Sequence, residues 1–575
     1  MTTPDVNTTM ATVLVDEWVR AGVREAVLAP GSRSAPLALA LAGDPRVRLS
    51  VFLDERSASY FALGAAKASG RPVVVLSTSG TAAANFHPAV VEAWHARVPL
   101  LVCTADRPPE LRDTGAGQAI DQIKLFGGAV RWFAEVGAPE PVPGAGRYWR
   151  SMASRAWAES VGPPAGPVHL NLAFREPLIP TGARLLDAPA RTHGAPWVES
   201  VPRVLAPHPD DVGAVVDAVD AHPRGLVAVG WGAAVSPQTL DRFAHAAGWP
   251  VLADAISGVR SGRSAISAYD PLLRDSDFGA RWRPDVVLHL GAPLTNRPAA
   301  AWLGPSVPRL LVDPQGSWLD PNRGLARRIA ADPDLLLDHA TTRLCGHGAN
   351  PGWLDHWLAT EATARHAIDR LLDSWEAPFE GRVVRDVVAA LADGATLVVG
   401  SSMPVRDAES FVAPRRGLRW LTNRGANGID GFVSTILGAA SVSDGPVVGL
   451  LGDLTFLHDV GGLLGSAGRG IDAALVVLDN DGGGVFSFLP QAELPEHFET
   501  LFGTPHGLDL VELAAAHGVV AQRVRSAADV VPALEAALGA GGVRLVVVPT
   551  DREDNVRRHR EVWAEVARAV AAATG

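Results

Sequence analysis

Two stretches in the last third of the chain combine a carboxylate, an amide and glycines in an order that suits a metal-bound phosphate ligand. Asp453 follows the apolar run VVGLLG, and Asn480 follows AALVVLD and precedes DGGG. Oxygen ligands at neighbouring strand ends hold a hard cation such as Mg²⁺, which needs few protein ligands when phosphates supply the rest. Glycines let the backbone approach a diphosphate closely. The pattern predicts a metal site made of Asp453, Asn480 and the carbonyl of Gly482.

Each half of this pattern also has an ordinary structural interpretation. Asp453 has the residue type and position of a helix N-cap. The segment DNDGGG has the composition of a turn. Either half alone leaves both interpretations open, so the combination has to decide between them.

The elements that position these residues alternate regularly between strands and helices. Over residues 1–185 an apolar strand, a small-residue turn and a helix recur in EAVLAPGSRSAP, VRLSVFLDERSASYF, RPVVVLSTSGTAAANF and VPLLVCTADRPPEL. Such alternation predicts right-handed crossovers and parallel sheets covered on both faces, with ligands at the carboxyl ends of the strands.

Two further αβ regions follow, so we expect three doubly wound, mainly parallel α/β domains. Strand candidates are GLVAVG, DVVLHLGAP and RLLVDP in the second, and ATLVVGSS, LRWLTN, PVVGLLGD, AALVVLDN and VRLVVVPT in the third. Proline- and glycine-rich residues 161–167 and 177–196 are interpreted as a boundary and a linker. The expected domains span residues 1–185, 195–350 and 360–575.

Composition excludes several classes of protein. A net charge of −11 argues against generic nucleic-acid binding. No apolar run is long enough to be an integral membrane segment, and the N-terminus lacks a secretory pattern. The two cysteines, Cys103 and Cys345, cannot form a disulfide framework or a cysteine zinc site, which favours the cytoplasm.

The spacing GDLT to LDNDGGG resembles the diphosphate-binding motif of thiamine-diphosphate enzymes. The resemblance implies thiamine diphosphate with Mg²⁺ or Mn²⁺ as cofactors. Leu454 stands where many members have glycine, and Asp479 where many have asparagine, but neither change removes a ligand. Ile429 lies where these enzymes place the aliphatic side chain that bends the cofactor.

The same resemblance implies a glutamate that bonds to the pyrimidine N1′ of the cofactor. Glu55, after VRLSVFL, is the candidate, and it would reach a cofactor held by the partner subunit. A glutamate in a first helical turn, favoured by the helix dipole, is the alternative interpretation. Thr78, Ser79 and Gly80 in TSGT would line the same cleft.

Longer motifs narrow the resemblance to one family. APGSRSAPLALAL, FLDERSASYFALG, TSGTAAANFHPAVVEA, TADRPPELRDTGAGQAIDQ, SSMPVRD and TNRGANGIDG are similar to 2-succinyl-5-enolpyruvyl-6-hydroxy-3-cyclohexene-1-carboxylate synthases of menaquinone biosynthesis. The resemblance implies decarboxylation of 2-oxoglutarate and addition of the four-carbon unit to isochorismate. It also implies a homodimer or a dimer of dimers with active sites at the subunit interface.

Both substrates carry two carboxylates, so the cleft needs several fixed cations, and the planar fork of arginine suits them. Arg33, Arg107, Arg406 and Arg424 all follow predicted strands inside the family-like motifs, and Arg297 lies in the second domain. By position, the further substrate residues are Ser32, Gln118, Ser402 and Phe486. The cofactor-binding residues are Pro30, Thr78, Gly80, Ser401, Met403, Ile429, Gly452, Asp453, Leu454, Asn480, Gly482, Gly483 and Val485.

Two departures and two alternatives qualify this assignment. Gly117 stands where the family often has asparagine, and Asn296 where some members have lysine, for which Arg297 is the candidate substitute. An acetolactate-synthase-like enzyme or another 2-oxoacid decarboxylase or carboligase is the nearest alternative, although it has little use for so many arginines. A non-catalytic α/β nucleotide-binding protein is the alternative from another class.

Overall fold

The computed structural model describes residues 5–183, 185–201, 203–344 and 351–574. Cys345 lies outside the described residues, while Cys103 is buried inside a strand. Three sheets, all with parallel pairing, lie one after another along the chain. This arrangement confirms the predicted α/β class, and each sheet lies within one of the predicted ranges; the boundaries between the domains stay a prediction.

The first sheet has the order β2-β1-β3-β4-β6-β5. Its strands are β1 (Glu25–Leu28), β2 (Arg48–Val51), β3 (Val73–Ser77), β4 (Leu100–Asp106), β5 (Trp132–Glu135) and β6 (Pro167–Ala173). Its helices are α1 (Val6–Ala21), α2 (Ala35–Gly43), α3 (Glu55–Ser69), α4 (Thr81–Ala84), α5 (His87–Ala96) and α6 (Ala145–Val161).

The boundary predicted at residues 161–167 is wrong. α6 ends at Val161 and β6 begins at Pro167, pairing with β4 and β5 inside the sheet. The segment is therefore a helix-to-strand turn, since its prolines and glycines end α6 without ending the domain.

The second sheet has the order β11-β10-β9-β7-β8. Its strands are β7 (Gly225–Val229), β8 (Val251–Ala253), β9 (Val286–Leu290), β10 (Arg309–Val312) and β11 (Leu325–Ile329). The helices of this part are α7 (Pro209–Ala221), α8 (Pro237–Ala247), α9 (Tyr269–Leu273), α10 (Ser276–Arg281), α11 (Arg297–Leu303), α12 (Pro333–Leu344) and α13 (Pro351–Asp373).

The third sheet has the order β13-β12-β14-β15-β17-β16. Its strands are β12 (Thr396–Val399), β13 (Arg419–Leu421), β14 (Val447–Gly452), β15 (Ala473–Asp479), β16 (Val520–Arg523) and β17 (Val543–Pro549). Its helices are α14 (Glu380–Ala390), α15 (Met403–Phe411), α16 (Phe432–Ala440), α17 (Asp453–His458), α18 (Pro495–Phe498), α19 (Leu510–Ala516), α20 (Val530–Ala540) and α21 (Arg552–Thr574).

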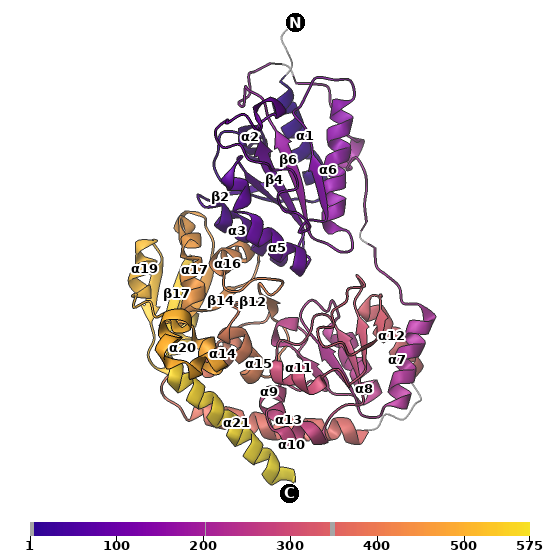
Figure 1. Cartoon of the computed structure of the whole chain (residues 1–575), viewed down its shortest axis with the longest axis vertical. Helices are drawn as coiled ribbons and strands as arrows, with labels where there is room; N and C mark the ends of the chain where they lie inside the picture. The colour runs from indigo at the N-terminus through magenta and orange to yellow at the C-terminus, as the bar shows by residue number, and fades with distance from the viewer. Residues whose placement is uncertain (1–4, 184, 202, 345–350, 575) are drawn as a thin grey trace.

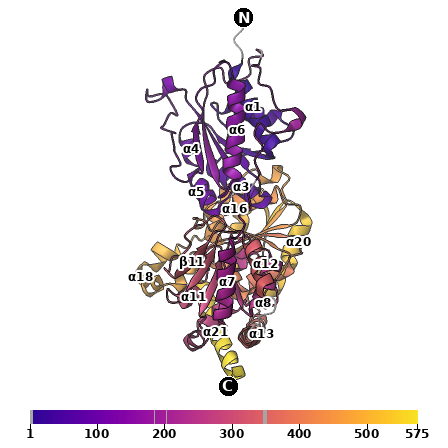
Figure 2. The same ribbon diagram turned by 90° about the vertical axis from the view of Figure 1, so that its right-hand side faces the viewer.

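The first domain lies at one end of the molecule, with the second and third domains beside each other at the other end (Figure 1). α13 and α21 pack together along the far side of the two lower domains. Turned by 90°, the molecule shows α3 and α5 next to α16 at the junction with the first domain (Figure 2). A single hydrophobic cluster spans this junction, including Phe61, Leu63, Phe432 and Ile436.

Glycines permit the close approach of α3 and α16. A Cβ at Gly64 would lie 2.0 Å from the carbonyl oxygen of Thr435, and a Cβ at Gly438 would lie 2.0 Å from that of Phe61. The backbones of the two helices are therefore in direct contact, and no larger residue fits without moving them apart.

Among the described residues, no helix combines the length and the apolar character needed to cross a bilayer.

Candidate active site

Asp453 links the carboxyl ends of two adjacent strands, β14 and β15. Its Oδ2 accepts hydrogen bonds from the backbone N–H of Asn480 (3.1 Å) and of Gly482 (2.8 Å), and its Oδ1 accepts one from Leu454 (2.6 Å). The N-cap of α17 is Gly452, without a side-chain cap. Burial raises the pKa of the Asp453 carboxyl to about 6, although the N–H groups of Gly482 and Leu454 oppose this shift. The helix-cap interpretation of Asp453 is therefore wrong.

Asn480 presents an unsatisfied oxygen beside this carboxylate. The residue is 9% exposed, and its Oδ1 is buried without a hydrogen-bond partner among the described residues. Its Nδ2 donates to Glu380. A buried polar atom without a partner costs about 1–3 kcal/mol. A cation bound here would remove that cost, so these residues fit a metal ion.

The turn after Asn480 has a backbone conformation that requires glycine. Asp481 has φ 54° and Gly482 has φ 144°. A Cβ on Gly482 would lie 2.1 Å from the Gly503 carbonyl oxygen, and a Cβ on Gly483 would lie 2.3 Å from that of Phe502. DNDGGG is thus a turn, as the alternative interpretation held, and Asp453 holds that turn in place. The glycines therefore let Phe502 and Gly503 pack directly against the turn.

His506 and Asp479 lie beside Asp453 and were not predicted as site residues. Single ligand atoms of Asp453, Asp479 and His506 lie within 4.8 Å of one another. His506 Nε2 is 3.5 Å from Asp453 Oδ2 and has no hydrogen-bond partner among the described residues. Burial raises the pKa of Asp479. The lone histidine in TPHG has no motif spacing to the aspartates, so the sequence carried no signal for it.

Four further predicted cofactor residues lie in the segments that follow β12, β13 and β15. Ser401 follows β12 and donates from Oγ to the carbonyl oxygen of Asn423 (3.4 Å). Met403 begins α15 and is buried. Ile429 is partly buried in the loop before α16, and Val485 is partly buried beyond the glycine turn.

Strained backbone occurs at two predicted substrate residues. Ser402 has φ 73° and Gln118 has φ 55°, a region that residues with a side chain rarely adopt. Such strain concentrates at functional sites, where the surrounding structure maintains it.

Three predicted arginines gather near the same strand ends. Burial, together with the charges of Arg424 and Arg297, lowers the pKa of Arg406 to about 10. Arg406 donates to the Ser402 carbonyl oxygen, and Nε of Arg424 is buried without a partner among the described residues. Cations held close together with so little neutralisation suit an anionic ligand.

A cavity of about 270 Å³ lies beside these arginines. Its lining includes Arg297, Met403, Arg406 and Val485 of the predicted residues. Asn296 also lines it, but its side chain caps α11 through Ala299 and donates to Asp270. Asn296 is thus engaged within the chain, and the neighbouring Arg297 is the basic side chain that lines the cavity.

A second group of predicted residues lies at the carboxyl ends of the first sheet. A Cβ on Gly31 would meet the Thr78 side chain at 2.3 Å, and a Cβ on Gly80 would lie 3.2 Å from Gln118. The loops that carry Pro30, Ser32, Thr78, Gly80 and Gln118 are therefore in contact. Pro30, Ser32 and Gln118 are exposed.

Arg33 and Arg107 belong to this second group. Burial, and then the charge of Arg107, lowers the pKa of Arg33. Arg33 Nη1 donates to the Phe174 carbonyl oxygen (2.8 Å), and Arg107 Nη2 donates to that of Gly117 (2.8 Å). The Gly117 contact with Arg107 is made by its backbone carbonyl and does not depend on a side chain at this position.

Glu55 begins α3, and its carboxylate has no hydrogen bond or ion pair with any described residue. The N-cap is Asp54, whose carboxylate accepts from the N–H of Arg56 and of Ser57. Beside it, Leu53 is 73% exposed. Glu55 thus lies in the first turn of α3, as the alternative interpretation held, while Asp54 caps the helix; its role toward the cofactor stays a prediction.

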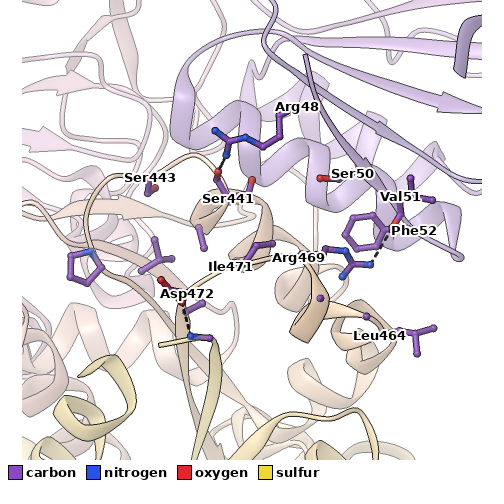
Figure 3. A pocket seen from close by; sticks show the side chains of 18 of the residues that line it. Arg48, Ser50, Val51, Phe52, Ser441, Ser443, Leu464, Arg469, Ile471 and Asp472 are labelled. Carbon is purple, nitrogen blue, oxygen red and sulfur yellow. Dashed lines mark hydrogen bonds between the residues drawn. The ribbon is translucent and has the colours of Figure 1, made fainter. Parts of the chain in front are cut away.

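The predicted residues at the strand ends of the first sheet make no direct polar contact, neither a hydrogen bond nor an ion pair, with those of the third sheet among the described residues. A cavity of about 1010 Å³ between β2 and the third domain lies at the amino ends of β14 and β15, the edge opposite Asp453 (Figure 3). None of the predicted site residues lines it.

Glu92 of α5 anchors the loop that carries Arg424 and Ile429. Its buried carboxylate accepts from the backbone N–H of Gly425, Ala426 and Asn427 and from Lys67. Sequence reasoning missed Glu92 because only the fold brings α5 to this loop.

Comparisons with known proteins agree with this geometry. Three family models match in order: "Thiamine pyrophosphate enzyme, N-terminal TPP binding domain" over residues 8–125, "Middle domain of thiamine pyrophosphate" over 195–399, and "Thiamine pyrophosphate enzyme, C-terminal TPP binding domain" over 400–548.

Similar full-length proteins occur in bacteria and archaea. A protein of Thermobifida fusca is 45% identical over 581 residues, covering 98% of this chain and 99% of its own. One of Geobacillus kaustophilus is 42% identical over 581 residues, covering 99% of both chains. One of Haloarcula marismortui is 40% identical over 595 residues, covering 99% of this chain and 100% of its own. All three carry the name 2-succinyl-5-enolpyruvyl-6-hydroxy-3-cyclohexene-1-carboxylate synthase.

Proposed function

Because the chain belongs to the 2-succinyl-5-enolpyruvyl-6-hydroxy-3-cyclohexene-1-carboxylate synthase family, we propose that it decarboxylates 2-oxoglutarate and joins the remaining four-carbon unit to isochorismate. The observation that carries this proposal is the group of Arg297, Arg406 and Arg424 beside the Asp453–Asn480 strand ends. A substrate with two carboxylates neutralises such a group, whereas a substrate the size of pyruvate leaves most of it unpaired.

The residues at the ends of β14 and β15 are proposed to hold Mg²⁺ or Mn²⁺. Asp453 and Asn480 supply side-chain oxygens, and Gly482 supplies its carbonyl oxygen. Diphosphate oxygens would complete the shell, which matches the small number of ligands that Mg²⁺ takes from proteins. The orphaned Asn480 Oδ1 supports this assignment.

When bound, thiamine diphosphate supplies the electron sink for the loss of CO₂ and for formation of the new carbon–carbon bond. The chain contributes binding, orientation and proton placement. Glu55 is proposed to hold a proton at the pyrimidine N1′, and Ile429 to support the bent cofactor. Arg33 and Arg107 bind carboxylates from the side of the first domain.

We also propose that the active site forms between two copies of the chain. The Glu55 carboxylate has no hydrogen-bond or ion-pair partner among the described residues, and exposed apolar side chains flank it at Val51 and Leu53. Residues of this kind are commonly covered at interfaces. A dimer or a dimer of dimers in the cytoplasm would bring Glu55 of one chain to the Asp453 end of another.

Measurement of CO₂ release tests the proposed function. The protein is supplied with thiamine diphosphate and Mg²⁺ and given 2-oxoglutarate or pyruvate, each with and without isochorismate. Sustained release from 2-oxoglutarate only when isochorismate is present is the expected result. Sustained release from pyruvate would instead assign the chain an acetolactate-synthase-like or decarboxylase activity. No release and no bound cofactor would contradict the whole proposal.

A further inference from the structure

Glu380 lies directly behind the proposed metal ligand Asn480. It is the first residue of α14 and is 1% exposed. Its Oε1 accepts hydrogen bonds from Asn480 Nδ2 (2.8 Å) and from the Thr550 hydroxyl (3.0 Å). The start of α14, the end of β15 and the segment after β17 therefore meet at one carboxylate oxygen.

This contact determines which end of the Asn480 side chain faces the metal position. An asparagine amide has a carbonyl oxygen at one end and an NH₂ group at the other, with nearly the same shape. Oε1 of Glu380 accepts from the Thr550 hydroxyl as well, so it acts as the acceptor that holds the NH₂ end. The oxygen then points away from Glu380, where Oδ1 is buried without a partner among the described residues.

We propose that Glu380 is a positioning residue, which acts through Asn480 by keeping the amide oxygen toward the metal and the NH₂ group away from it. The inference rests on the proposed function, because it assumes that Asn480 is a ligand. Glu380 is proposed to act from behind the ligand, because it contacts the NH₂ end of Asn480 and not the end that carries Oδ1. Partners behind a ligand commonly tune metal affinity in this way.

The alternative is that Glu380 only stabilises the start of α14. A purely structural role would affect folding and leave the metal affinity of the folded protein unchanged. Three variants separate the two roles. Glu380→Met removes the acceptor with little change in volume, Glu380→Gln keeps one acceptor oxygen for Asn480, and Thr550→Val removes only the other donor.

Binding of Mn²⁺ to the full chain is measured by electron paramagnetic resonance, after removal of metals with EDTA and with saturating thiamine diphosphate. We expect Glu380→Met to weaken Mn²⁺ binding about 10–100-fold, the usual effect of losing a partner behind a metal ligand. Glu380→Gln and Thr550→Val are expected to bind Mn²⁺ nearly as tightly as the wild type. Circular dichroism checks that each variant is folded.

A double variant tests whether Glu380 acts through Asn480. In an Asn480→Ala background, Glu380→Met should have little further effect on Mn²⁺ affinity. Equal affinity of folded Glu380→Met and wild type would overturn the inference, as would fully additive losses in the double variant. If the wild type itself binds no Mn²⁺ with thiamine diphosphate, the proposed metal site fails as well.

Discussion

Replacing Glu92 by glutamine tests how the loop with Arg424 and Ile429 is held. Glu92 is 0% exposed. Its Oε1 accepts from Lys67 (3.0 Å) and Gly425 (3.1 Å), and its Oε2 accepts from Ala426 (2.7 Å) and Asn427 (3.1 Å). Although burial opposes it, Lys67 and the backbone N–H groups lower the pKa of this carboxyl.

Glutamine keeps one of the two acceptor oxygens and turns the other into an NH₂ donor. Two of the groups that donated to the carboxylate then face the NH₂ group, which also donates. In addition, the buried Lys67 ammonium loses its counter-ion. Breaking a buried pair from one side costs about 3–5 kcal/mol. We expect Glu92→Gln to lower stability by this amount and to raise the KM for the dicarboxylate substrate, because the loop carries Arg424.

Urea unfolding and steady-state kinetics measure both effects. Glu159→Gln is the matched control: its exposed pair with Arg155 is worth about 0.5 kcal/mol or less. Adding Lys67→Met to Glu92→Gln should recover part of the loss, about 1–3 kcal/mol, since the unpaired cation is gone. If Glu92→Gln were as stable as Glu159→Gln, the reasoning on this buried pair would be refuted.

Four other changes have defined outcomes. Glu55→Gln should reduce turnover about 10²–10⁴-fold with folding intact, measured as CO₂ release. Arg424→Ala should raise the KM for the dicarboxylate substrate and leave thiamine diphosphate affinity, measured by calorimetry, unchanged. Gly438→Ala should lower the free energy of unfolding by about 1–3 kcal/mol, measured with urea, because the added methyl group overpacks against α3. Gly43→Ala is the control and should leave stability unchanged, since its Cβ would meet no atom within 4 Å. As the pH rises from 4 to 7, the free energy of unfolding of Asp459→Asn should increase by up to about 3 kcal/mol relative to that of the wild type. Unfolding of both proteins at each pH measures this difference.

The sign of the Asp459 effect follows from its burial. Burial raises its pKa from 3.8 to about 6, so between these values the folded protein binds more protons than the unfolded chain. The stability from this group is therefore present at low pH and is lost as the pH rises through about 6. Asparagine does not titrate and keeps an acceptor for the Ser434 N–H.

Three results would contradict the remaining expectations. Wild-type turnover in Glu55→Gln would remove this residue from the chemistry. Collapse of cofactor affinity in Arg424→Ala would assign that arginine to the diphosphate instead of a substrate. An unchanged stability of Asp459→Asn relative to wild type across the pH range would show that the carboxyl stays ionised in its pocket.

The sequence was sufficient for most central strands, but it marked only some of the edge strands, such as β2 and β13. Runs such as VVVLS and AALVVL are buried on both faces and therefore continuously apolar. β11 (LARRI) and β16 (VAQR) are sheet edges with exposed polar residues, so no apolar run marks them. β6 was missed because prolines and glycines precede it and because it buries His169 and Asn171.

The site residues also divide into those that a sequence pattern marks and those that only the fold brings together. Asp453 and Asn480 were predicted from motifs, and the structure places them at adjacent strand ends because their spacing along the chain reflects the sheet. Their role as ligands stays a prediction. Glu380, Glu92 and His506 reach the site from distant elements through single side chains. One glutamate or histidine has no periodic or spaced pattern, so only the fold reveals its partner.

The contact of α3 with α16 also constrains biosynthesis. Thr435 Oγ1 donates to the Tyr60 carbonyl oxygen across 375 residues of chain. At ribosomal rates of about 5–20 residues per second, α3 emerges roughly 20–75 seconds before its partner helix exists. During that interval the face of α3 that later packs against α16 is exposed. Its apolar surface is then available to chaperones or to other nascent chains. The first domain thus completes its packing only after translation has passed α16.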